Sequence, residues 1–149
     1  MNTIIKYDDR VLEEIRILIS EGRKVTIKAR GNSMNPFIVD KRDQIKLGPW
    51  ENEELKRGTV ALVKDIKGKY VLHRVILREG DRLTLMGDGN LKGTETAQIS
   101  DVIGIMKSVT RKGREYSADS ATWKVYSWLW MSLSPIRRWP LGLWRRLCL

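Results

Sequence analysis

The chain has 149 residues, a formal net charge of +10 at pH 7, and 42% hydrophobic and 31% charged residues, which is typical of a globular protein of one domain, with or without an appendage. Its single cysteine excludes an internal disulfide, and one cysteine with one histidine does not make a zinc site of the usual kind. The first ten residues are mostly polar, and no run reaches the roughly 20 apolar residues of a spanning helix, so neither a secretory signal nor a transmembrane anchor is expected.

The first predicted element is an amphipathic helix. Apolar side chains recur at helical spacing over residues 11–19, and Asp8 or Asp9 precedes them as a candidate N-cap. Gly22 comes after them as a natural stop. We expect this helix to cover one end of a sheet.

Residues 23 to about 118 are predicted to form strands. Short apolar or alternating runs are separated by glycine turns. The predicted strands are 25–30, 44–47, 58–63, 69–77, 83–86, 102–109 and 115–117, with hairpin turns at 79–81 and 111–113. The fold class is therefore mostly β, as a small irregular barrel or sandwich.

The last thirty residues differ in kind, so we divide the chain into a domain (1–119) and a tail (120–149). Residues 121–133 lack Gly and Pro and are predicted to be helical, whereas Pro135 and Pro140 prevent the helix from continuing beyond them. Five basic residues and no acid lie in 121–149, together with five of the six tryptophans.

Ser33 lies in the run Gly31-Asn32-Ser33-Met34-Asn35-Pro36. Gly31 lets the backbone turn tightly and Pro36 fixes the direction of the chain, so we expect the hydroxyl at a strand-to-loop junction, exposed yet held. Ser33 is a candidate nucleophile. A plain turn is the alternative interpretation.

The only histidine, His73, lies in the strand-like run 70–76. Alternation puts His73 on one face with Val71 and Val75, and Arg74 on the other. Because an imidazole titrates near neutrality, His73 is a candidate general base for Ser33. A packed, hydrogen-bonded core histidine is the alternative.

A carboxylate beside such a histidine would orient the ring and stabilise its charged form. Two candidates lie further along the sequence. Asp88 lies in the turn-forming run Met86-Gly87-Asp88-Gly89-Asn90, and Glu95 comes seven residues after it.

In this order, the motifs Gly-x-Ser-Met-x-Pro, His-Arg-Val-Ile and Gly-Asp-x-Asn resemble those of the type I signal peptidase family. The closest branch is the archaeal and endoplasmic-reticulum one, in which histidine stands in place of the bacterial general-base lysine. The resemblance covers about residues 25–110.

The resemblance implies a mostly-β catalytic domain with Ser33 as nucleophile and His73 as general base. It also implies that the backbone N–H of Ser33 contributes to an oxyanion hole. The substrate would add as an extended strand beside the strand that precedes Ser33. The residues expected around the substrate there are Arg30, Gly31, Ser33 and Met34.

The chain departs from the family at two points. Where the family usually has an aspartate, six or seven residues beyond the Gly-Asp turn, this chain has Glu95, so Glu95 ranks ahead of Asp88 and both remain candidates. The amino-terminal membrane anchor typical of the family is not found. Processing of a leader on the cytoplasmic side is therefore as consistent with the sequence as removal of a signal peptide.

We expect the tail to take the place of the anchor, because tryptophan favours the membrane–water boundary and arginine favours anionic headgroups. The predicted membrane contacts are Trp128, Trp130, Trp139, Trp144, Arg137, Arg138, Arg145 and Arg146. Packing of the tail helix on the domain is one alternative. Binding of single-stranded nucleic acid is another, but no nucleic-acid motif supports it.

The sequence thus predicts a serine endopeptidase, peripheral to the cytoplasmic side of a membrane. It would remove a leader or signal segment from a small precursor peptide, with no metal or organic cofactor. One alternative is a self-cleaving regulator similar to the SOS-repressor peptidases, which would need lysine where the chain has His73. The other is a non-catalytic module that docks on membrane or nucleic acid through its basic tail.

Overall fold

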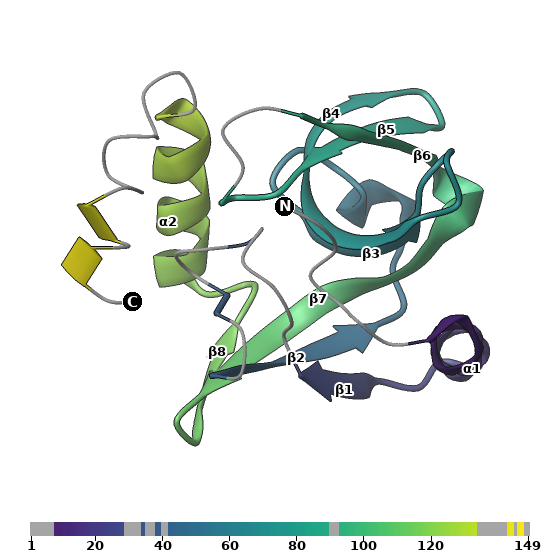
Figure 1. Ribbon diagram of the computed structural model, residues 1–149, viewed down its shortest axis with the longest axis horizontal. Helices are drawn as coiled ribbons and strands as arrows, with labels where there is room; N and C mark the ends of the chain where they lie inside the picture. Colours follow the sequence, from purple (N-terminus) through teal and green to yellow (C-terminus); the bar gives the residue numbers. More distant parts are fainter. Residues whose placement is uncertain are drawn as a thin grey trace.

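The computed structural model describes residues 8–28, 34, 38–39, 42–89, 93–133, 143–144 and 146–147. Its elements are α1 (Asp9–Ser20), β1 (Val25–Lys28), β2 (Asp43–Gly48), the 3-10 turn η1 (Asn52–Glu54), β3 (Val60–Lys64), β4 (Tyr70–Glu79), β5 (Arg82–Met86), β6 (Glu95–Gln98), the 3-10 turn η2 (Ile99–Asp101), β7 (Val102–Arg111), β8 (Arg114–Ser117) and α2 (Ala121–Ser132). The strands curl into an antiparallel half barrel, with α1 and α2 on opposite sides of it (Figure 1). The predicted fold class is confirmed.

The eight strands form one sheet in the order β1-β2-β7-β3-β4-β5-β6, with β8 paired to β7. Both predicted hairpins are present, since β4 pairs with β5 and β7 pairs with β8. The second turns through Lys112 and Gly113, both at positive φ, as a tight two-residue turn of type I′ requires. Strand β6 was not predicted, because its four residues do not alternate between apolar and polar.

Helix α1 begins and ends where the sequence indicates. The side chain of Asp8 accepts a hydrogen bond from the backbone N–H of Val11 at 3.0 Å, which caps the helix. The helix buries Ile19 against β7, where a Cβ added to Gly104 would lie 2.7 Å from the Cδ1 of Ile19. The missing side chain at position 104 therefore lets α1 pack close to the sheet.

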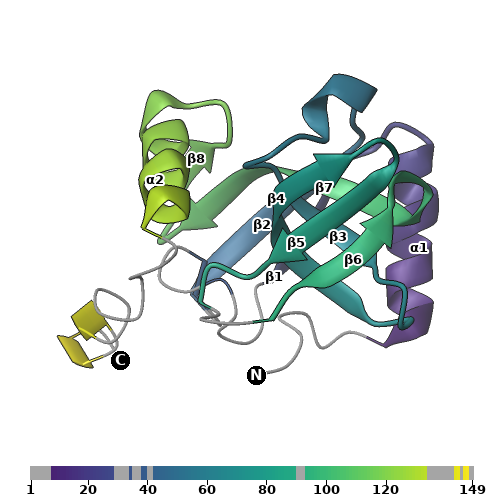
Figure 2. The ribbon, with the colours of Figure 1, turned by 90° about the horizontal axis from the view of Figure 1, so that it is seen from above.

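Two hydrophobic clusters cover the two faces of the central strands. The first contains Leu62 and Leu72, together with side chains of α1 and Trp123 of α2. The second contains Ala61 and Val71, together with side chains of β5 and β6. Residues 70–75 of β4 are all buried, and because side chains alternate along a strand, they enter the interior from opposite faces. Figure 2 shows the sheet lying between α1 and α2.

Helix α2 packs on the strand domain. Ser120 caps it by accepting a hydrogen bond from the N–H of Trp123 at 3.2 Å, and Trp123 is 4% exposed. The predicted helix over 121–133 is thus confirmed as Ala121–Ser132. Because Trp123 belongs to the first hydrophobic cluster, this part of the predicted tail contributes to the core of the domain.

Candidate active site around β4

Several predicted site residues lie outside the part of the chain that the structure describes. They are Arg30, Gly31, Ser33, Arg137, Arg138, Trp139 and Arg145. The expected proximity of the Ser33 hydroxyl to the His73 imidazole therefore stays a prediction. The predicted residues that the structure describes are Met34, His73, Asp88, Glu95, Trp128, Trp130, Trp144 and Arg146.

His73 meets a carboxylate. It lies within β4, opposite Ala61 of β3, and is 3% exposed. Its Nδ1 contacts Oε1 of Glu95, the first residue of β6, whose side chain is 16% exposed. A carboxylate at Nδ1 orients the ring and stabilises the imidazolium that forms when the other nitrogen takes a proton. Of the two acids that the sequence left open, Glu95 is the one that contacts His73.

Asp88 pairs instead with Arg74, the residue after His73. Two hydrogen bonds join them, from Nε to Oδ1 at 2.8 Å and from Nη2 to Oδ2 at 2.6 Å, and both side chains are almost completely buried. Burial alone would lower the pKa of Arg74, but the Asp88 carboxylate outweighs it and raises this pKa. Arg74 therefore stays charged in the interior.

The same arginine ties β4 to α2. Its Nη1 donates to the carbonyl oxygen of Gly58 at 3.0 Å and to Oγ of Ser127 at 2.6 Å. Its guanidinium lies 5.7 Å from the ring centroid of Trp123 and 5.6 Å from that of Tyr126. The hydroxyl of Tyr126 also donates to Oδ2 of Asp88 at 3.0 Å.

Sequence reasoning did not find the role of Arg74. A signal was available, because an arginine inside an apolar strand requires a buried carboxylate to offset the cost of its desolvation. Asp88, in the turn after the next strand, satisfies that requirement.

Met34 connects the serine motif to the turn that contains Asp88. It is fully buried in the first cluster, and its Sδ accepts a hydrogen bond from the N–H of Asp88 at 3.3 Å. Met34 is the residue directly after Ser33 in the sequence. Met34, the residue of the Gly31–Pro36 motif that the structure describes, therefore contacts Asp88. Asp88 in turn pairs with Arg74, the residue after His73 in β4.

The prediction that Trp130 contacts a membrane is wrong. Trp130 is 7% exposed, and its Nε1 donates to the carbonyl oxygen of Asp88 at 2.8 Å. The sequence alternative of a tail helix packed on the domain is correct for this residue. Trp128 on the same helix is 62% exposed, Arg146 is exposed and Trp144 is half-buried.

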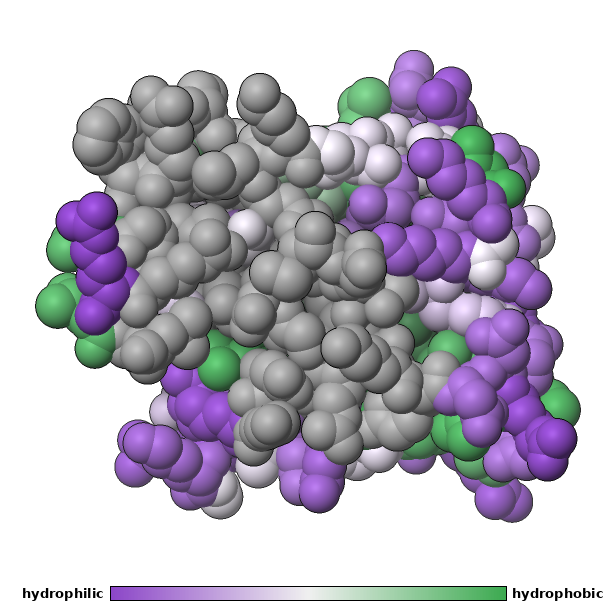
Figure 3. Space-filling model, viewed as in Figure 1, coloured by the Kyte–Doolittle hydropathy of each residue, from purple (hydrophilic) through white to green (hydrophobic). Residues whose placement is uncertain are grey.

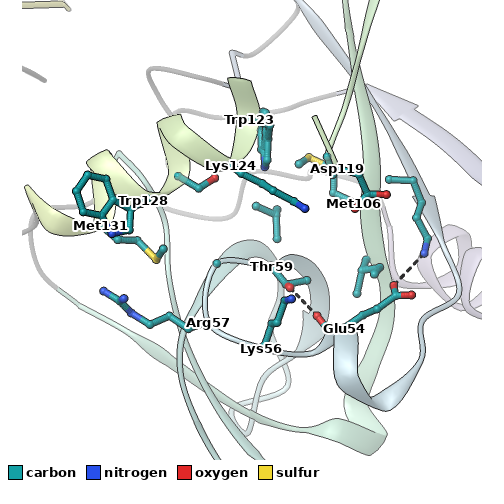
Figure 4. Close-up of a pocket in the computed structure, with 16 residues that line it drawn as sticks. Glu54, Lys56, Arg57, Thr59, Met106, Asp119, Trp123, Lys124, Trp128 and Met131 are labelled. Atoms are coloured by element: carbon teal, nitrogen blue, oxygen red, sulfur yellow. Dashed lines mark hydrogen bonds and ion pairs between the residues drawn. The ribbon is translucent and has the colours of Figure 1, made fainter. Parts of the chain in front are cut away.

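A cavity of about 480 Å³ lies between α2 and the chain that leads into β3 (Figure 4). Neither His73 nor Glu95 lines it. Within the described ranges, no three His, Cys, Asp or Glu side chains gather as a metal site would require. None of the described helices has the length and apolar character needed to cross a bilayer.

Comparison with known proteins yields no match: no protein-family model, curated protein or solved structure is significantly similar to this chain.

Proposed function

We propose that the chain is a serine endopeptidase of the signal peptidase type, which removes a leader or signal segment from a small precursor peptide. Ser33 is the nucleophile, His73 the general base and Glu95 the residue that orients the imidazole. The observation that carries the proposal is the partly buried contact between Nδ1 of His73 and Oε1 of Glu95, one of the two acids that the sequence offered as partners of His73.

In the proposed reaction, Oγ of Ser33 attacks the carbonyl carbon of the scissile peptide bond while Nε2 of His73 takes the hydroxyl proton. The oxyanion accepts a hydrogen bond from the backbone N–H of Ser33. The C–N bond then breaks, and His73 gives its proton to the departing amine. A water molecule, deprotonated by His73, attacks the ester and releases the new carboxyl terminus and the serine hydroxyl.

Two further contacts support this assignment. Arg74 and Asp88 hold β4 against α2, so the strand that carries His73 is fixed on the face opposite the imidazole. Met34 holds the chain next to Ser33 against that same pair. Rigid support of this kind is what a nucleophile and its base need to keep their alignment.

Profiling with a mixture of synthetic peptides, read by mass spectrometry, tests the activity. We expect the wild-type chain to cut after small residues. Ser33→Ala and His73→Gln should each lower the rate by about 10³-fold or more. The matched control Ser100→Ala changes an exposed serine of η2 and should cut normally.

Circular dichroism would check that each variant is folded. Cleavage that persists in folded Ser33→Ala would overturn the proposal. A folded wild-type chain that cuts none of the peptides would favour the non-catalytic binding module.

We also propose that the protein binds the surface of an anionic membrane. Apolar side chains are exposed on α2, where Val125 is 56% and Leu129 47% exposed, and near the described end of the chain, where Leu143 is 58% and Leu147 75% exposed. Figure 3 shows small hydrophobic areas at several points of the margin of one face, among hydrophilic surface that predominates on the right. The net charge of +10 complements anionic headgroups.

Co-sedimentation with vesicles of phosphatidylglycerol and phosphatidylcholine tests this second proposal. The double variant Val125→Glu/Leu129→Glu should bind less than the wild type. The control Ser132→Glu adds charge to an exposed position of the same helix and should bind more than the double variant. Equal binding by all three proteins would remove α2 as the contact surface.

A further inference from the structure

The cavity beside α2 has a lining that the proposed catalytic chemistry does not use. We call it the α2 groove and define it by Lys56, Arg57, Lys107, Lys124, Trp128 and Met131 (Figure 4). Three of these residues lie on α2 at positions i, i+4 and i+7, so they share one face of the helix. The others come from the chain before β3 and from β7.

The groove is positively charged. Four cationic and two acidic side chains line it. One cation is paired, since Nζ of Lys107 lies 3.1 Å from Oε2 of Glu54. Lys56, Arg57 and Lys124 are exposed and make no ion pair within the described part of the chain. In Figure 4 the side chain of Lys124 extends from α2 into the space above Thr59. The groove therefore favours an anionic ligand.

One wall of the groove is apolar. Trp128 is 62% exposed and Met131 lies beside it on α2 (Figure 4). A large exposed aromatic next to exposed cations suits a ligand that alternates apolar and acidic groups. The volume of about 480 Å³ is within the range of pockets that hold a small molecule or a few residues of a peptide.

The groove is physically joined to the strand that carries His73. Gly58 and Ser127 line it, and both accept hydrogen bonds from Nη1 of Arg74. An extended peptide advances about 3.3 Å per residue, so roughly ten residues span a distance close to the diameter of a small domain. A short precursor can therefore occupy the groove with one segment while another segment reaches the opposite face of β4.

We propose that the α2 groove is a docking site for an acidic, amphipathic segment of the precursor peptide, away from the bond that is cut. This inference rests on the proposed function, because the docked peptide is the substrate. Glutamate or aspartate side chains meet Lys56 and Lys124, and an apolar side chain packs on Trp128. The groove thus selects precursors by a segment that the catalytic residues do not touch.

The binding test uses full-length Ser33→Ala protein, so that a bound peptide is not cut. The probe is a short fluorescein-labelled peptide of leucine and glutamate, compared with the same peptide carrying lysine or glutamine in place of glutamate. We expect the glutamate peptide to bind at least tenfold more tightly than the lysine peptide, with an affinity that falls as salt is added. Equal affinity for the three peptides would overturn the proposal.

Reversing the charge of single lysines of the α2 groove tests whether the peptide binds there. Lys124→Glu, on α2, and Lys56→Glu, in the loop before β3, should each weaken binding of the glutamate peptide by about tenfold. Glutamate in the first half of α2 is compatible with the helix dipole, so Lys124→Glu should fold. The control Lys67→Glu reverses an exposed lysine in the β3–β4 turn and should bind as before. Equal losses in the control would show that only overall charge matters and would overturn the groove as the site.

Two competitors identify other occupants. Single-stranded oligothymidylate and phosphatidylglycerol vesicles are titrated against the bound peptide. If either binds more tightly than the glutamate peptide and loses its affinity in Lys124→Glu, the groove takes nucleic acid or lipid and the peptide proposal fails.

The docking proposal and the peptidase proposal fail in different ways. Groove-dependent binding with no cleavage by the wild type would refute the peptidase and leave the docking site. Cleavage of a peptide with a KM that is the same for the wild type, Lys124→Glu and Lys56→Glu would refute the docking site and leave the peptidase.

Discussion

Two consecutive residues of β4 each face a carboxylate, and the two pairs differ in almost every other respect. Arg74 and Asp88 are both nearly fully buried and share two hydrogen bonds, with further bonds from Tyr126 and Trp130 to Asp88. His73 meets Glu95 through one nitrogen, and Glu95 keeps part of its side chain exposed. Arg74 and Asp88 make the many buried hydrogen bonds that are typical of residues that stabilise a fold. The histidine pair joins an imidazole, a group that can act as a general base, to a carboxylate whose side chain is partly exposed.

Alternation along one buried strand places a stabilising ion pair on one face of β4 and the candidate general base on the other. Adjacent side chains point to opposite faces, so the anchor and the candidate base are one residue apart and do not compete for space.

The largest effect is expected from breaking the anchor. Arg74→Ala leaves the Asp88 carboxylate buried without its partner, which should lower the free energy of unfolding by about 4 kcal/mol. Urea denaturation measures this. The control Arg82→Ala removes an exposed arginine of β5 and should change the free energy by less than about 0.5 kcal/mol. Similar losses in the two variants would contradict the role of Arg74 as an anchor.

Glu95→Gln should act mainly on activity. The amide keeps the shape of the side chain but removes the charge that stabilises an imidazolium, so kcat should fall by about 10²-fold, equivalent to about 2.7 kcal/mol. The unfolding free energy should change by no more than about 1 kcal/mol. Glu79→Gln, at the exposed end of β4, is the matched control. A large loss of stability with unchanged kcat would make Glu95 a structural residue like Asp88.

Asp43 provides another buried carboxylate for comparison. Burial alone would raise its pKa, but hydrogen bonds from Arg42, Arg111 and the N–H of Val39 lower it below the ordinary value. A lowered pKa in the folded state means that Asp43 stabilises the fold at neutral pH, and that this contribution is lost as the pH falls through the folded-state pKa.

Asp43→Asn should therefore cost about 2 kcal/mol at neutral pH and much less in acid, below the ordinary aspartate pKa of about 3.9. Urea denaturation of both proteins across this pH range measures the difference. The exposed Asp81→Asn is the control. A difference between wild type and Asp43→Asn that does not shrink in acid would show that the carboxylate charge is not the source of the stability.

The smallest effect is expected at the link to α2. Ser127→Ala removes one acceptor of Arg74 and leaves the carbonyl of Gly58, so the unfolding free energy should fall by about 1 kcal/mol. Ser132→Ala, on the exposed side of the same helix, should be neutral within about 0.5 kcal/mol. If both variants unfold at the same urea concentration, the bond between Ser127 and Arg74 contributes nothing to stability.

Local signals in the sequence were sufficient to predict much of the fold. The cap at Asp8, the hairpin at Lys112 and Gly113, and the alternation around His73 all depend on residues close in the chain. Strand β6 could not be found this way, because Glu95–Gln98 is short and polar and becomes a strand by pairing with β5.

The site was predictable only in part, for a similar reason. Motif order brought Glu95 forward as a partner of His73, yet only the sheet order shows that β4 and β6 flank β5 and that the two side chains meet. Trp130 was misassigned because its acceptor, the carbonyl of Asp88, lies 42 residues earlier in the chain. A tryptophan-rich helix has the same sequence pattern whether its rings face lipid or a buried polar group.

The attachment of α2 limits what can be learned by shortening this protein. A chain cut after residue 119 would keep every strand, yet it would uncover the Arg74 guanidinium and remove Trp123 from the interior. Any activity or membrane binding that such a fragment loses would reflect damage to the fold of the domain as much as the loss of the tail. Dissecting the two ends of the molecule therefore calls for single-residue exchanges that leave the helix seated.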